Sequence, residues 1–159
     1  MANVFLICGK ICSGKSTYAK KLAKTHNAVI LSVDEIMLAI FDHGAGEQHD
    51  LYVKRLQEYL YQKALELVTL DINVILDFGF WTKQERLYAQ KFFLTKNIAF
   101  EFHYLNISNE EWQRRLVKRN AEVSEKNKHS YFVDEGLKKK FENLFEPPQK
   151  EEIHVWIEE

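Results

Sequence analysis

The sequence predicts an α/β fold built around a parallel sheet. Short apolar runs, rich in β-branched and aromatic residues, recur along the chain, as is typical of strands buried on both faces. Stretches with helical spacing of apolar residues lie between these runs, and such alternation implies right-handed crossovers between parallel strands. The five runs span residues 4–8, 28–31, 74–76, 98–105 and 153–157.

Length and composition indicate one folded domain, residues 1–159. The chain is 46% hydrophobic with only two prolines, which is too apolar and too poor in breakers for a disordered chain. Its net charge of −1 gives no overall basic field for tight non-specific binding to nucleic acid, although a local basic face would suffice. Nucleic acid is therefore not the favoured partner.

Cysteine content and the lack of long apolar runs bear on the cellular compartment. Cys8 and Cys12 form neither a disulfide framework nor a four-ligand zinc set, so we expect free thiols in a reducing cytoplasm. The first apolar run is far too short to cross a bilayer, and it lacks the flanks of a secretion signal. We expect a cytoplasmic protein that does not contact membranes.

The first strand leads directly into the clearest motif, a complete G-x-x-x-x-G-K-S sequence followed by a helical stretch. Glycines let the backbone curl so that successive N–H groups point at a phosphate, and the positive end of the following helix adds to the attraction. Lys15 is expected to reach the β- and γ-phosphates of ATP, and the Ser16 hydroxyl to bind Mg²⁺. The expected nucleotide-binding residues are Gly9, Lys10, Ile11, Cys12, Ser13, Gly14, Lys15, Ser16 and Thr17.

The second strand ends in a pair of carboxylates, Asp34 and Glu35, where parallel strands collect ligands. Transfer of a phosphoryl group to a hydroxyl needs a carboxylate that accepts the proton of the acceptor and orients its oxygen. Asp34 is the candidate for this role, and Glu35 is a candidate acceptor contact. The alternative is that Asp34 caps the helix of residues 36–41.

Recognition of the acceptor is expected from the polar, glycine-containing segment 42–50 and the helix that begins near residue 51. Apolar residues at 56, 60, 64 and 67 mark the buried face of this helix. Tyr52, Arg55 and Tyr59 recur on another side, and Arg55 is a candidate acceptor contact.

The third strand carries an acid, Asp77, at its end, in a degenerate Walker B pattern. Asp77 is expected to contact the metal or the acceptor; a polar strand end is the alternative. Thr82 is the expected cap of the next helix, because Glu85 three residues later completes a capping box. Trp81 and Arg86 are candidate acceptor contacts, with core packing and a solvated helix face as their alternatives.

The fourth strand is followed by a basic helix. Arg115 and Arg119 lie four residues apart and so share one face of it. Arginines that a closing lid brings over a transferred phosphoryl group stabilise its charge and exclude water. We expect a lid at about residues 115–133, including a polar loop at 120–131; a solvated basic face or a nucleic-acid patch is the alternative. A further helix is expected at about 134–145.

These motifs together resemble a P-loop kinase of the AAA-33/zeta-toxin-like group, which includes polynucleotide 5′-hydroxyl kinase domains, chloramphenicol phosphotransferase and many uncharacterised bacterial ATP-binding proteins. The resemblance covers nearly the whole chain and implies a three-layer P-loop NTPase fold of nucleoside-kinase type, with five parallel strands in the order 2-3-1-4-5 and a helical lid. It is carried by residues 9–17, 32–35, 76–81 with Arg86, 115–120 and 141–148.

The resemblance also implies roles for single residues. Lys15 and Ser16 would hold ATP·Mg²⁺, Asp34 would be the base, and Arg115 or Arg119 would act from the lid. Arg86 matches a position near the acceptor. Zeta toxins are usually longer and carry extra segments that bind sugar nucleotides, which argues against that substrate for this compact chain.

The sequence therefore predicts an ATP-dependent kinase that transfers the γ-phosphate to a hydroxyl of a small-molecule acceptor, with ATP and Mg²⁺ as cofactors. Two alternatives stay open at this stage. One is a 5′-hydroxyl polynucleotide kinase, and the other is a nucleotide-binding regulatory module that signals to a protein partner.

Overall fold

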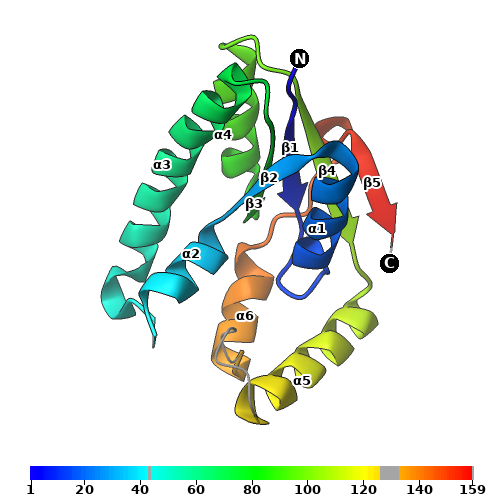
Figure 1. Ribbon diagram of the computed structural model, residues 1–159. Helices are drawn as coiled ribbons and strands as arrows, with labels where there is room; N and C mark the ends of the chain where they lie inside the picture. The colour runs from blue at the N-terminus through cyan, green and yellow to red at the C-terminus, as the bar shows by residue number, and fades with distance from the viewer. Residues whose placement is uncertain (43, 126–132, 159) are drawn as a thin grey trace.

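The computed structural model describes residues 1–42, 44–125 and 133–158, which form a twisted sheet covered by helices (Figure 1). All four strand pairings are parallel, and the order is β2-β3-β1-β4-β5. This confirms the predicted order 2-3-1-4-5. The strands are β1 (Val4–Cys8), β2 (Ala28–Ser32), β3 (Asn73–Gly79), β4 (Phe100–Asn106) and β5 (Val155–Glu158).

Helices lie on both faces of the sheet and below its carboxyl edge. Helix α1 covers one face, α3 and α4 cover the other, and α5 and α6 lie beyond the strand tips (Figure 1). The α-helices are α1 (Lys15–His26), α2 (Val33–Ile40), α3 (His49–Thr69), α4 (Lys83–Leu94), α5 (Asn109–Glu125) and α6 (Glu135–Leu144); two short 3-10 helices are η1 (Gly46–Gln48) and η2 (Lys150–Glu152). The arrangement confirms the three-layer α/β fold.

The core follows from the alternation of side chains along β1. Leu6 faces α3 and α4, whereas Phe5 and Ile7 face Ala19 and Leu22 of α1. Every residue of β1 is buried, as expected for the central strand of a parallel sheet. The strand therefore holds the residues that follow it rigidly at the carboxyl edge of the sheet.

The structure differs from the sequence prediction at two connections. The predicted polar loop begins at residue 120, whereas α5 continues to Glu125. Residues 120–125 include no glycine or proline, so nothing in the sequence ends the helix there. The rest of that loop, residues 126–131, lies outside the described residues, as do His43 and Phe132. Segment 42–50 is not entirely loop, because it includes η1 and the first residues of α3.

Asn120 joins the two described ends of the expected lid. Its amide nitrogen donates to the carbonyl oxygen of Val133 at 2.6 Å, and its amide oxygen accepts from the Val133 N–H at 2.9 Å. This paired contact fixes the start of α6 against the later turns of α5. Among the helices of the described residues, none is long and apolar enough to cross a membrane.

Candidate active site

The loop after β1 has the backbone geometry of a phosphate-binding loop. Gly14 has a φ of 93°, a left-handed conformation that favours glycine, and lies immediately before α1. A Cβ at Gly9 would come within 2.7 Å of the Ser13 hydroxyl, so a side chain does not fit there. The Gly9 N–H donates to the Gly79 carbonyl at 3.0 Å, which fastens the loop to the end of β3.

Several polar groups of this loop are placed to receive an anion. No side chain caps α1 and no acidic residue of the helix lies in its first turn, so the N–H groups at its positive end are not neutralised from within the helix. The Ser13 hydroxyl is fully buried and lacks a hydrogen-bond partner among the described residues. Lys15 Nζ donates to the Lys10 carbonyl of its own loop at 2.7 Å. These features fit the triphosphate of a nucleotide.

The two residues expected to bind metal are adjacent. Ser16 Oγ donates to Asp77 Oδ2 at 3.4 Å, although the residues are 61 positions apart in sequence. Burial raises the pKa of the Asp77 carboxyl, and the negative charges of Asp34 and Glu35 raise it further, while Lys15 opposes the shift. A divalent cation beside Asp77 would favour its ionised form.

This pair fits Mg²⁺ better than a metal held entirely by protein. The described residues contain no group of three or more histidine, cysteine or acidic side chains that could hold a metal ion. Mg²⁺ retains several waters and substrate phosphate oxygens, and it needs few protein ligands. One hydroxyl and one carboxylate, next to a phosphate loop, match that requirement.

Asp34 does not cap α2, which was the alternative explanation for its position in the sequence. The cap of α2 is Ser32, whose hydroxyl accepts a hydrogen bond from the Glu35 N–H at 3.3 Å. Ser32 pairs with Asp77 across β2 and β3, so α2 begins beside the carboxylate that is expected to bind metal. Asp34 and Glu35 lie in the first turn of α2 and are exposed, and both affect the charge of Asp77.

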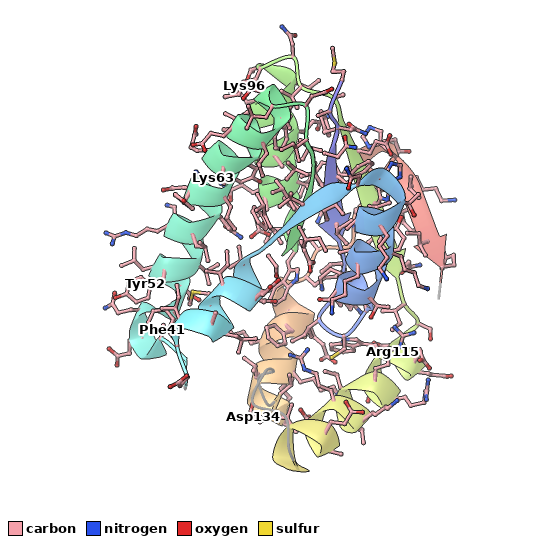
Figure 2. The ribbon with its side chains drawn as sticks, in the orientation of Figure 1. Phe41, Tyr52, Lys63, Lys96, Arg115 and Asp134 are labelled. Carbon is pink, nitrogen blue, oxygen red and sulfur yellow. The ribbon has the colours of Figure 1, made fainter. Side chains whose placement is uncertain are left out.

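Helix α5 packs directly on the phosphate loop. The Trp112 indole N–H donates to the Ile11 carbonyl at 2.7 Å, and Arg119 Nη1 donates to Cys12 Sγ at 3.3 Å. Arg119 Nε is buried without a partner among the described residues. Arg115 instead donates from Nε to Glu111 of the previous turn at 2.8 Å; Figure 2 shows it on α5 below the loop. Arg119 thus reaches from α5 to the phosphate loop.

The family follows from a comparison with known families. The model of the AAA_33 family, described as an AAA domain, matches residues 4–148. The chain belongs to the AAA_33 family. No curated protein matches its sequence.

Solved structures show which fold this AAA_33 protein shares. A candidate kinase from Chloroflexus aurantiacus is 15% identical, with a TM-score of 0.72 over 99% of this chain and 86% of that one. Chaetomium thermophilum Kti12 in complex with ADP-AlF3 is 15% identical, with a TM-score of 0.71 over 98% and 88% of the two chains. Mycobacterium tuberculosis APS kinase CysC, in complex with AMPPNP and APS, is 18% identical, with a TM-score of 0.63 over 99% and 88%. The AAA_33 chain therefore has the P-loop kinase fold.

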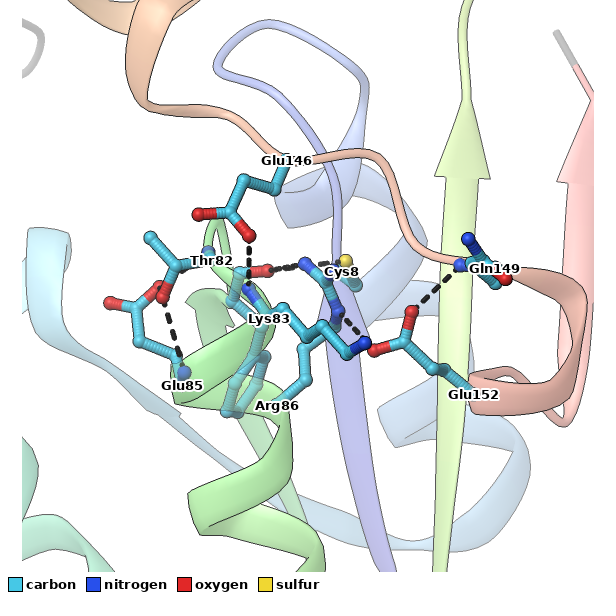
Figure 3. Close-up of polar contacts among 9 residues, drawn as sticks. Cys8, Thr82, Lys83, Glu85, Arg86, Glu146, Gln149 and Glu152 are labelled. Atoms are coloured by element: carbon cyan, nitrogen blue, oxygen red, sulfur yellow. Dashed lines mark hydrogen bonds and ion pairs between the residues drawn. The ribbon is translucent and has the colours of Figure 1, made fainter.

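Arg86, expected beside the acceptor, is instead buried in a hydrogen-bond network of the AAA_33 fold (Figure 3). Its Nε donates to Glu152 Oε1 and its Nη1 to the Phe80 carbonyl, both at 3.0 Å. Burial raises the pKa of the neighbouring Cys8 thiol to about 12, although Arg86 opposes the shift. Arg86 therefore has a structural role, because it connects α4 to the segment that leads into β5.

Trp81 and Arg55, two further candidate acceptor contacts, differ in their burial. The ring of Trp81 packs edge-on against Phe141 of α6 at 4.8 Å between centroids, and its carbonyl accepts from the Glu146 N–H at 2.7 Å. Packing, the alternative given for Trp81, accounts for its position. Arg55 is exposed on α3.

A cavity of about 260 Å³ lies between α3 and α4 and is lined in part by Phe78 and Phe80. Phe80 directly follows β3 and precedes Trp81, so the sequence prediction of an acceptor contact at Trp81 came within one residue of the cavity wall. The lining residues from α3 and α4 were not predicted, because their meeting depends on how the two helices pack.

Proposed function

We propose that this AAA_33 protein is an ATP-dependent kinase that transfers the γ-phosphate to a hydroxyl group of a small molecule. The observation that supports this most strongly is the position of Asp34. A nucleotide switch needs only a phosphate loop and an acid that binds the metal. The loop of residues 9–17 and Asp77, which contacts Ser16, meet these two needs. Asp34 is an additional carboxylate at the same edge, exposed and without a capping role. A base for an acceptor hydroxyl accounts for it.

In the proposed transfer, the Asp34 carboxylate accepts the proton of the acceptor hydroxyl while the acceptor oxygen forms a bond to the γ-phosphorus of ATP. The bond from that phosphorus to the bridging oxygen breaks, and ADP leaves with the electron pair. Mg²⁺ would neutralise part of the phosphate charge when bound, and Ser16 and Asp77 are the residues that would hold the metal.

The remaining residues would position and shield the reacting groups. Lys15 would exchange its bond to the Lys10 carbonyl for phosphate oxygens, which keeps the number of its hydrogen bonds unchanged. Arg119 extends from α5 to the loop and would stabilise charge on the phosphoryl group in flight. We propose residues 115–133 as the lid, with Arg115 as the second lid arginine.

The test is release of ADP from ATP and Mg²⁺ with pooled acceptors: nucleosides, sugars, aminoglycoside and phenicol antibiotics, and 5′-hydroxyl oligonucleotides. At least one pool should raise the rate above background, and Asp34→Asn should remove that increase while ATP still binds. Asp71→Asn is the matched control, because Asp71 is exposed at the opposite end of β3. Full acceptor-dependent turnover by Asp34→Asn would contradict the proposal.

The same experiment identifies the alternatives. Stimulation by oligonucleotides that weakens steeply with salt would indicate a polynucleotide kinase. ATP binding with no stimulation by any pool, together with ATP-dependent capture of a protein, would indicate a regulatory module.

A further inference from the structure

The cavity between α3 and α4 adjoins the proposed catalytic edge. Phe78, which lines it, directly follows Asp77 in β3, and the two side chains point to opposite faces of the strand. Phe78 also packs against the cluster that contains Val33, the residue before Asp34. The cavity is thus one residue from the metal-site acid along β3, and Phe78 joins it to the start of the helix that carries the base.

The turn after β3 holds another part of the cavity wall in an uncommon backbone conformation. Gly79 and Phe80 have φ values of 82° and 48°, so two successive residues are left-handed. The Phe80 carbonyl accepts from Arg86 Nη1 at 3.0 Å and from the Cys8 thiol at 3.5 Å, and these bonds keep the turn in place. Such conformations persist where the surroundings fix them, and they cluster at ligand sites.

Aromatic rings supply much of the cavity wall. Phe78 and Phe80 stack with an interplanar angle of 30° and centroids 5.6 Å apart, while Tyr61 meets Phe78 and Tyr88 edge-on at 5.6 Å and 5.3 Å. All four line the cavity. Rings in this arrangement offer both faces and edges, and a flat ring of a ligand can pack against either.

The polar groups of the wall leave little net charge for an ionic ligand. Lys54 and Glu58 lie four residues apart on α3 and offset each other. Glu85 accepts hydrogen bonds from the Thr82 N–H at 2.8 Å and the Thr82 hydroxyl at 3.2 Å, so its charge is committed to the start of α4. The other polar residues of the wall are Gln57 and Gln84, whose neutral amides can both donate and accept.

We propose that this cavity is the acceptor site of the kinase and that the acceptor is an uncharged alcohol carrying an aromatic ring. This inference rests on the proposed function. The ring packs on Phe78 and Tyr88, the two glutamine amides bond its polar substituents, and the hydroxyl extends toward Asp34. At about 260 Å³ the cavity is smaller than most drug-sized sites, so it suits a molecule no larger than a nucleoside.

Two of the wall residues allow a clean test. Tyr88 and Gln57 line the cavity without being fully buried, so Tyr88→Ala and Gln57→Ala leave the core intact. Leu87→Ala is the matched control, because Leu87 precedes Tyr88 on α4, is similarly exposed and does not line the cavity. The acceptor panel contains adenosine, uridine and 2-phenylethanol as uncharged aromatic alcohols, glucose as a non-aromatic one, and ribose 5-phosphate as an anionic one.

Acceptor-dependent ADP release and direct binding, by saturation-transfer NMR, are measured for each panel member. An aromatic alcohol should be the best acceptor, and Tyr88→Ala should raise its KM about tenfold with little change in kcat, whereas Leu87→Ala should leave its KM unchanged. A preference for glucose or ribose 5-phosphate, or an unchanged KM in both cavity variants, would overturn the acceptor class or its site and leave the kinase proposal intact.

Binding separates a failure of this inference from a failure of the kinase proposal. If aromatic alcohols bind the wild-type protein but not Tyr88→Ala, and no member of this panel or of the acceptor pools is phosphorylated, the cavity binds them without being an acceptor site and the kinase proposal fails. If no aromatic alcohol of the panel binds or is phosphorylated, this inference is wrong.

Discussion

Replacing Glu152 by alanine tests whether Arg86 has a structural role. The Arg86 side chain is 2% exposed and that of Glu152 is 18% exposed, so the substitution leaves a guanidinium charge inside the protein without its carboxylate. Breaking a fully buried ion pair in this way costs about 3–5 kcal/mol. Arg86 keeps its bond to the Phe80 carbonyl and Glu152 is partly solvated, so we expect a loss of about 2–3 kcal/mol in the free energy of unfolding.

Urea unfolding and thermal melting measure this loss. For a chain of this size, Tm should fall by about 5–10 °C. Glu152→Gln should lose about 1 kcal/mol, because its amide oxygen still accepts from Arg86 Nε. The control is Glu151→Ala, since Glu151 is exposed in the same short helix and should stay within about 0.5 kcal/mol of wild type. A similarly small change in Glu152→Ala would refute the structural role of Arg86.

Three further predictions concern the metal, the lid and pH. Asp77→Asn should weaken ATP binding about tenfold or more in Mg²⁺ but leave metal-free binding nearly unchanged, as titration with and without EDTA would show. Arg119→Ala should lower kcat about a hundredfold or more, and Arg115→Ala should lower it less, because Arg119 contacts the phosphate loop; equal effects would contradict this order. Burial lowers the pKa of His103, although Glu101 opposes the shift. The folded state therefore favours the neutral ring, stability should fall as pH drops below the ordinary value of 6.5, and urea midpoints of His103→Gln should depend less on pH between 5 and 7.

Local sequence patterns carried most of the fold. The five strands are apolar runs, and the capping box at Thr82 and Glu85 formed as predicted. The predicted end of α5 was wrong, because a polar composition does not stop a helix when glycine and proline are absent. The strand order depended on the family resemblance, since no local pattern states which strands become neighbours.

Site residues were predictable where chemistry is local and less so where it depends on distant partners. The phosphate loop is one continuous motif, and the Ser16–Asp77 contact follows from two strands ending at one edge. The structural role of Arg86 depends on Glu152, 66 residues away, and no spacing rule connects them. The alternative explanation of Asp34 as a helix cap does not apply, because α2 begins at Val33 and not at residue 36, which makes Ser32 the residue before its first turn.

The contact between α5 and the phosphate loop also places a tryptophan where its fluorescence should respond to a ligand bound in the loop. Trp112 is fully buried, and its indole N–H bonds the Ile11 carbonyl inside the loop. Lys10 Nζ lies 4.8 Å from the centroid of its ring. Any rearrangement of the loop around a ligand changes both the hydrogen bond and the charge next to this chromophore. We therefore expect its emission spectrum to change on ligand binding, and replacing both Trp81 and Trp156 would leave Trp112 as the one tryptophan that emits.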